Sequence, residues 1–211
     1  SRNGSLDVRS VAENYLAEKK FFIPKFNNIF LVNTAQISSL ISEKFPSAEN
    51  VKVQKDYWHG LKISLDQKEA VGVWCYAKDN QCVYFDRHGT AFDTVTETSG
   101  AILLNVSDQK GNFNKLGQPV SNLELFKLIE QTNDELKKGK IIATKFIIPE
   151  AVDFRLDAQT TQGWKIYFST KEDLAKQLTN LYLFLSQKIT PEKRGRLVYI
   201  DLTVPNRVYY K

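Results

Sequence analysis

The sequence is poor in the residues that usually carry catalysis or metal binding. Its 211 residues include only two cysteines and two histidines. His59 and His88 each lie in a predicted turn, and neither has a further ligand at the spacing of a metal site. There is no glycine-rich phosphate loop, no G-x-S-x-G motif and no H-E-x-x-H motif. Four carboxylates on predicted strands and turns form no recognisable acid and base pair: Asp86, Asp153, Asp157 and Asp201. We therefore expect a protein that is not an enzyme and binds no cofactor.

Long apolar runs are also missing. No stretch approaches the length of about 18 apolar residues that indicates a membrane span, and the first residues lack the apolar segment of a signal peptide. If the protein is exported, we expect its export signal or membrane anchor to lie outside these 211 residues. The net charge of +5 suits either ordinary solubility or a position beside anionic lipid. Basic clusters at 137–140 and 193–196 lack interleaved aromatic residues, so we expect no nucleic-acid partner.

The two cysteines are placed symmetrically about a predicted hairpin loop. Residues 71–75 and 82–85 have the pattern of strands, and the polar run 78–81 between them suits a tight connection. Cys75 and Cys82 lie equally far from the loop centre, so they would face each other where Cα atoms are about 4.5–5.5 Å apart. We expect a disulfide, which would indicate an oxidising compartment. The alternative is two reduced, half-buried cysteines that pack as small apolar residues.

What is present is a set of strands and short helices in two blocks. The first block predicts a helix over 11–19, a strand over 29–32, a helix capped by Asn33, and strands at 51–53 and 61–65. The second predicts a helix from Pro119 to Gly139 and a helix capped by Ser169 with Glu172. Its predicted strands are 71–75, 82–85, 90–92, 102–106, 141–148, 153–156, 164–168, 197–203 and 207–210. We predict an α+β fold, with a small αβ module followed by a β-rich domain carrying two helices on an open, mostly antiparallel sheet.

The order of several short motifs resembles the bacterial cell-division protein family FtsQ/DivIB, in a divergent form typical of small genomes. The motifs are Val51-Lys52-Val53, Leu61-Lys62-Ile63-Ser64-Leu65, Glu69-Ala70-Val71-Gly72-Val73-Trp74, the run 84–92 that contains Asp86-Arg87-His88-Gly89, and Tyr199-Ile200-Asp201-Leu202-Thr203. The resemblance covers residues 10–211. The sequence departs from the family pattern at Lys68-Glu69-Ala70, which lacks the usual arginine and proline, and at Thr203, where the family favours arginine.

The resemblance implies both an architecture and a role. It implies a juxtamembrane leader at 1–21, a POTRA domain at 22–70 and a β domain at 71–211. It also implies a bitopic protein of the cell membrane, anchored through a segment outside this chain, with this region extracytoplasmic at the division septum. The implied role is a non-catalytic divisome scaffold that binds small coiled-coil proteins of the FtsB and FtsL type and helps regulate the septal peptidoglycan synthases. Two alternatives stay open: a POTRA-bearing module of another export or assembly system, and a periplasmic glycan-binding domain.

The end of the sequence supplies the candidate binding site. A strand late in a sheet leaves one edge unpaired, and such an edge accepts an extended peptide through main-chain hydrogen bonds. We expect this at residues 203–210, with an FtsB-type segment as the added strand and Arg207 facing an acidic partner residue. The candidate partner-binding residues are Thr203, Val204, Asn206, Arg207, Val208, Tyr209 and Tyr210. The alternative is that Tyr209 and Tyr210 only cover the core.

Overall fold

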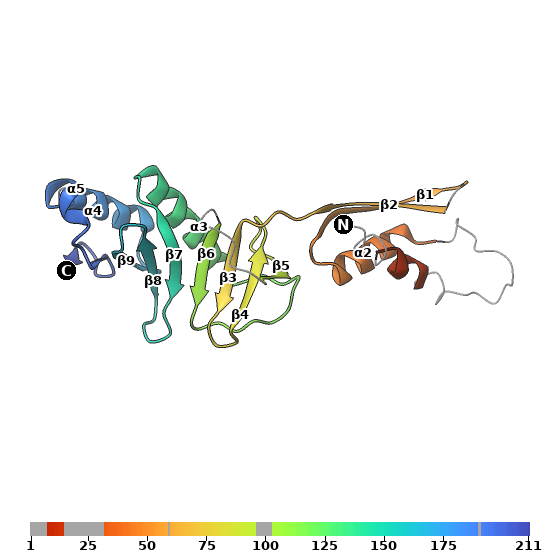
Figure 1. Cartoon of the computed structure of the whole chain (residues 1–211), viewed down its shortest axis with the longest axis horizontal. Coiled ribbons are helices and arrows are strands. Elements are labelled where there is room, and N and C mark those ends of the chain that lie inside the picture. Colours follow the sequence, from red (N-terminus) through yellow and green to blue (C-terminus); the bar gives the residue numbers. More distant parts are fainter. Residues whose placement is uncertain (1–7, 15–31, 59, 96–102, 190) are drawn as a thin grey trace. The chain divides into compact units, whose positions relative to one another are not determined.

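The chain forms two compact units in the computed structural model, residues 1–69 and residues 70–211. The structure describes residues 8–14, 32–58, 60–95, 103–189 and 191–211 (Figure 1), and each unit is considered by itself. The strand predicted at 29–32 falls almost entirely outside the described residues, and the helix predicted at 11–19 does so in part. The described elements confirm the predicted α+β class.

Unit 1 packs helices against a two-stranded antiparallel hairpin. Helix α2 (Thr34–Lys44) begins where predicted, because the side chain of Asn33 accepts a hydrogen bond from the N–H of Gln36 at 3.1 Å. Strands β1 (Ala48–Asp56) and β2 (Gly60–Gln67) pair along their length. Residues 8–14 are also helical. Among the described residues of this unit, the buried core cluster is Val11, Ala12, Ile37 and Ile41, and Val51, Val53, Leu61 and Ile63 pack against it from the strands.

Unit 2 is built on a nine-stranded mixed sheet with the order β11-β10-β9-β8-β7-β6-β3-β4-β5. Three neighbouring pairs are parallel (β9–β10, β3–β6 and β6–β7) and the other five are antiparallel. The strands are β3 (Gly72–Tyr76), β4 (Gln81–Phe85), β5 (Ala91–Thr94), β6 (Leu104–Asp108), β7 (Ala143–Ile148), β8 (Arg155–Thr160), β9 (Lys165–Ser169), β10 (Tyr199–Asp201) and β11 (Tyr209–Tyr210).

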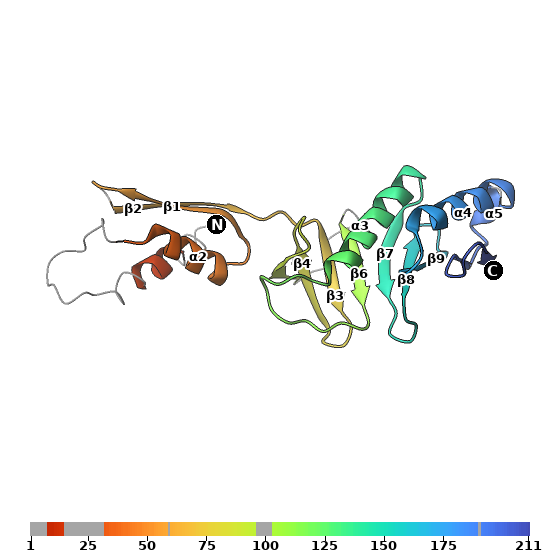
Figure 2. The same ribbon diagram turned by 180° about the vertical axis from the view of Figure 1, so that it is seen from behind.

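Two helices pack on one face of this sheet, and no described helix lies on the other face, which we call the open face. Figure 2 shows α3 (Leu123–Lys138) and α4 (Leu174–Gln187) in front of the strands, and a short helix α5 (Pro191–Arg194) follows α4. Successive strand side chains point to opposite faces, so Trp74, Val106 and Phe146 are buried under the helices. On the open face, the strand register places one row of residues across the sheet: Cys82, Cys75, Ser107, Ile147, Asp157, Tyr167 and Asp201.

The predicted cap of the last long helix is wrong. Helix α4 begins four residues later than expected, because Asp173 is its N-cap and accepts from the N–H of Lys176 at 2.9 Å. Ser169 instead ends β9, where it pairs with Arg155 of β8. The side chain of Gln177 then binds both the N–H and the carbonyl of Ser169, at 2.8 and 3.0 Å. The main-chain groups of Ser169 are thus held by the strand and by Gln177, and Ser169 does not cap the helix.

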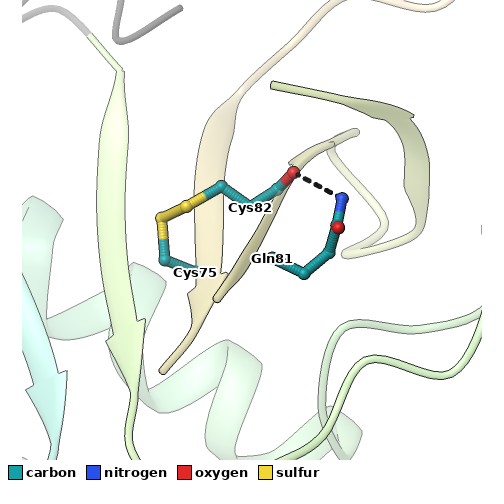
Figure 3. Close-up of a disulfide and its surroundings, with 3 residues drawn as sticks. All are labelled: Cys75, Gln81 and Cys82. Atoms are coloured by element: carbon teal, nitrogen blue, oxygen red, sulfur yellow. Dashed lines mark hydrogen bonds between the residues drawn. A yellow bond between two sulfur atoms is a disulfide. The ribbon is translucent and has the colours of Figure 1, made fainter. Parts of the chain in front are cut away.

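The predicted disulfide is confirmed. Cys75 of β3 and Cys82 of β4 stand directly opposite each other and are bonded, with a Cα–Cα distance of 4.0 Å (Figure 3). The turn between them contains Asn80 with a positive φ of 50°, a conformation that asparagine tolerates. Both cysteines are half-buried on the open face of the sheet. A disulfide is typical of extracytoplasmic compartments.

Candidate partner-binding edge

The last strands of the chain form one edge of the large sheet. Strand β10 pairs in parallel with β9, and β11 returns antiparallel to β10, with Ile200 opposite Tyr210 and Asp201 opposite Tyr209. Among the described residues, no further strand pairs with the outer side of β11. This edge therefore ends in a two-residue strand, which is shorter than the strand predicted over 207–210.

A turn accounts for the short strand. The carboxylate of Asp201 accepts from both the N–H and the hydroxyl of Thr203, at 2.8 and 2.6 Å, which draws the chain out of the strand. The N–H of Arg207 then donates to the carbonyl of Val204 at 3.2 Å, and Asn206 adopts a positive φ of 59°. Proline at the second position and a left-handed third residue are typical of a type II turn. Of the candidate residues, Thr203 to Val208 therefore lie outside the strand.

The hydrogen-bonding pattern identifies the residue at this edge whose main chain faces outward. The N–H of Lys211 donates to the carbonyl of Tyr199 at 3.2 Å, and the N–H of Tyr199 donates back at 3.4 Å. In an antiparallel pair, such bonded residues alternate with residues whose N–H and C=O point away from the neighbouring strand. Tyr210 is the alternating residue, so its main-chain N–H and C=O point away from β10. Sequence reasoning did not assign a role to Lys211, which holds this register.

Exposed apolar side chains accompany the edge. Tyr209 is 46% exposed and Tyr210 is 54% exposed. Tyr210 lies against Phe184 of α4, with ring centroids 4.8 Å apart, and thus it faces the helix side of the sheet. Tyr209 faces the open side, and its hydroxyl accepts from the guanidinium of Arg207 at 3.3 Å. Further exposed apolar residues near the end of the chain or on α4 are Leu183, Val198 and Val204. Val208 is different, because it packs against the core.

An aromatic stack stiffens the open face beside this edge. Tyr167 of β9 stacks on Tyr199 of β10 with a centroid distance of 5.3 Å, and the guanidinium of Arg155 lies 4.4 Å from the centre of the Tyr167 ring. Arg155 also binds Asp157 through two hydrogen bonds of 2.7 and 3.1 Å. Burial raises the pKa of Asp157, and the bonds from Arg155 oppose that rise without cancelling it. These contacts tie β8, β9 and β10 together beneath the edge.

The remaining carboxylates that the sequence singled out make structural contacts. Asp86 holds its turn by accepting from the N–H groups of His88 and Thr90 at 2.9 and 3.0 Å. Asp153 forms an ion pair with Lys110 at 2.5 Å, which lowers the pKa of Asp153. Among the described residues, no group of three or more histidine, cysteine or acidic side chains is arranged to hold a metal ion. The described helices likewise include none that is long and apolar enough to cross a bilayer.

Comparison with known proteins adds no family assignment. No family model matches this sequence, and no curated protein matches it either. The edge geometry and the sequence motifs are therefore the grounds for a functional proposal.

Helix α4 contributes a residue to the edge that sequence reasoning did not find. The periodicity of Leu174, Leu178, Leu181 and Leu185 predicts the buried side of α4, and those four leucines are buried or packed on the core. Phe184 is adjacent to that stripe, so periodicity alone does not separate a core residue from an edge residue. Only the position of β11 relative to α4 assigns Phe184 to the edge.

Proposed function

We propose that this chain is the extracytoplasmic part of an FtsQ/DivIB-like divisome scaffold. It captures a small coiled-coil protein of the FtsB or FtsL type by accepting an extended segment of that partner as a further strand on β11. The scaffold has no catalytic role of its own and helps regulate septal peptidoglycan synthesis by holding those partners. The disulfide supports an extracytoplasmic location, because such bonds persist in oxidising compartments.

The observation that carries the proposal is the outward main chain of Tyr210. An N–H and a C=O that point away from β10 form the start of a hydrogen-bonded ladder for an added strand. Side chains flank that ladder on both faces, since Tyr210 lies toward α4 beside Phe184 and Tyr209 lies toward the open face. Aromatic anchors of this kind contribute much of the binding energy at protein interfaces.

Arg207 adds a charge to the same edge. Its guanidinium is exposed, and the hydrogen bond to the Tyr209 hydroxyl raises the pKa of Arg207 further above its usual range. It therefore keeps its positive charge at any physiological pH. We expect an acidic residue of the partner to lie opposite Arg207, beside the added strand.

The test compares two substitutions at one position. The whole chain is immobilised and exposed to detergent-solubilised membranes of the native cell, and retained proteins are identified by mass spectrometry. Tyr210→Pro removes the outward N–H, while Tyr210→Ala removes the side chain and keeps the N–H. We expect the wild-type chain to retain FtsB-type or FtsL-type proteins, Tyr210→Ala to retain them more weakly, and Tyr210→Pro to lose them.

The outcomes separate the parts of the proposal. Circular dichroism of each variant checks that the fold is intact, and Val208 is left unchanged because it packs on the core. Retention by Tyr210→Pro equal to that of Tyr210→Ala would contradict strand addition at β11. If the wild-type chain retains no division protein of either type, the scaffold role is wrong.

A further inference from the structure

The tip of the β1–β2 hairpin in unit 1 presents two aromatic side chains to solvent. Trp58 is 91% exposed and Tyr57 is 61% exposed, which makes them the most exposed large apolar residues among those described. The turn itself is ordered by a hydrogen bond from the N–H of Trp58 to the carboxylate of Asp56 at 3.1 Å. Because this bond fixes the main chain at Trp58, insertion of the indole would cost mainly the rotamer freedom of the side chain.

The hairpin separates its core contacts from this tip. Val51, Val53, Leu61 and Ile63 pack toward the buried side chains of α2, and they occupy one face of the two strands. Strand β2 runs from Gly60 at the tip to Gln67 near the connection to unit 2, a length of about 25 Å at the usual rise per residue. Trp58 and Tyr57 thus contribute nothing to the core described for unit 1.

The exposed apolar area at the tip is small. Within the described part of unit 1, the only other exposed large apolar residue is Leu65, which lies five residues beyond the start of β2. A stable protein interface buries about 800 Å² on each partner around an apolar centre, which two neighbouring aromatic side chains do not provide. Tryptophan and tyrosine are instead the residues that concentrate at the boundary between lipid headgroups and acyl chains.

The charge of the hairpin changes sign along its length. The half near the tip, residues 52–62, holds Lys52, Lys55 and Lys62 against the single acidic residue Asp56. The half near the base holds the acidic residues Glu49 and Asp66 and no basic residue between 48 and 51 or between 63 and 67. Lys52 and Lys62 are exposed on the strand face away from the core. An anionic surface would therefore attract the tip more strongly than the base.

We propose that the tip of the β1–β2 hairpin is a site for binding an anionic lipid surface, with Trp58 and Tyr57 inserting at the headgroup level and Lys52 and Lys62 contacting lipid phosphates. The aromatic pair supplies the apolar insertion, and the lysines select anionic over neutral lipid. This site is independent of the partner-binding edge in unit 2 and does not depend on the proposed scaffold role.

The chain carries its own reporter for this proposal. Of its three tryptophans, Trp74 is 0% exposed and Trp164 is 1% exposed, so Trp58 alone can respond to an added surface. The whole chain is titrated with vesicles of phosphatidylcholine, with or without phosphatidylglycerol. With phosphatidylglycerol present, we expect the emission of Trp58 to move to shorter wavelength and to become protected from iodide. Vesicles of phosphatidylcholine alone should produce a much smaller change.

Sedimentation with the same vesicles then measures the effect of substitutions. Trp58→Ala should weaken binding about tenfold or more, since it removes the main inserting group. Lys62→Gln should weaken binding about fivefold, as expected for one lysine at an anionic surface. Lys44→Gln removes the same charge from the end of α2, near the base of the hairpin, and serves as the matched control that leaves binding unchanged. Leu65→Ala is the corresponding apolar control.

Three results would overturn the proposal. The first is an emission spectrum that anionic vesicles do not change. The second is vesicle binding that Trp58→Ala does not weaken, because binding would then come from another part of this basic chain. The third is an equal effect of Lys44→Gln and Lys62→Gln, which would show a response to total charge and not to the hairpin tip. Circular dichroism of each variant confirms that the fold is retained, as expected for exposed side chains.

Discussion

The two units of this chain bury their apolar side chains by different means. Unit 1 has a two-stranded sheet, which is marginal by itself, and its described core consists of a few aliphatic residues held between helices and hairpin. Unit 2 packs α3 and α4 against one face of its nine-stranded sheet, and its buried core includes Trp74, Trp164, Phe85 and Phe168. No residue is shared between the two core clusters. Each unit is therefore stabilised by its own core, so a destabilising substitution in one core should lower the stability of that unit and leave the other unchanged.

The largest effect should come from the two cores. Phe168→Ala removes a fully buried ring from unit 2 and should cost about 3–5 kcal/mol of its unfolding free energy. Ile37→Ala should cost about 2–5 kcal/mol in unit 1. Hydrogen exchange followed by mass spectrometry measures the amide exchange rates of both units in one sample. Each substitution should accelerate exchange only within its own unit, and acceleration of both units by either one would contradict separate cores.

Removal of the disulfide should also destabilise unit 2 alone, but by a smaller amount. Replacing Cys75 and Cys82 together by serine opens a loop with a sequence separation of 7 residues, and chain entropy for such a loop is worth about 2–3 kcal/mol. We expect this loss in unit 2 alone, measured by denaturant unfolding and by hydrogen exchange. A reducing agent should reproduce the loss in the wild-type chain and have no effect on the double variant. Faster hydrogen exchange within unit 1 would contradict the prediction that the disulfide stabilises unit 2 alone.

The smallest effect should be a pH dependence that belongs to unit 2. Burial raises the pKa of Tyr76 to about 12, with the negative charges of Asp108 and Asp79 adding to the rise, whereas a tyrosine in the unfolded chain titrates near about 10. The folded state therefore keeps the phenolic proton to higher pH than the unfolded state. This stabilisation is complete below about pH 10 and is lost as the pH rises toward about 12.

Tyr76→Phe isolates that contribution. The variant keeps the ring and loses the hydrogen bond to the carbonyl of Val120, so we expect it to be less stable at neutral pH by about 1 kcal/mol. Between about pH 9.5 and 11 its unfolding free energy should then fall less steeply than that of the wild-type chain. Hydrogen exchange in unit 1 over the same pH range serves as the internal reference, since Tyr76 belongs to unit 2. Parallel pH profiles of variant and wild type would rule out this role for Tyr76.

Much of the local structure could be predicted because the signals for it are local. The symmetry of Cys75 and Cys82 about a polar turn predicts both the hairpin and the disulfide, since opposed residues follow from counting away from the turn. Asn33 followed by an amphipathic stretch predicts the start of α2. The same kind of pattern gave a wrong prediction at Ser169. The sequence pattern of a helix cap does not show that β8 and Gln177 already bind the main chain of that residue.

The candidate edge could be predicted only in part. An apolar, aromatic end of the chain predicts that it adds to a sheet, and Tyr209 and Tyr210 do so. Strand β10 ends at Asp201, whose carboxylate accepts hydrogen bonds from Thr203, and the chain turns before β11 begins. That competition between a side chain and the ladder for the same N–H has no reliable sequence signal.

By itself, the sequence determined the alternation of strands, the two amphipathic helices and the pairing of the cysteines, because each depends on neighbours within about ten residues along the chain. The tertiary structure alone decided the order of strands in the sheet, the contact of Phe184 with Tyr210 and the need for glycine at position 72. At Gly72, a side chain would collide with the carbonyl of Leu104 and the ring of Phe85. Such contacts join residues far apart in the sequence, so they exist only once the strands have been brought together.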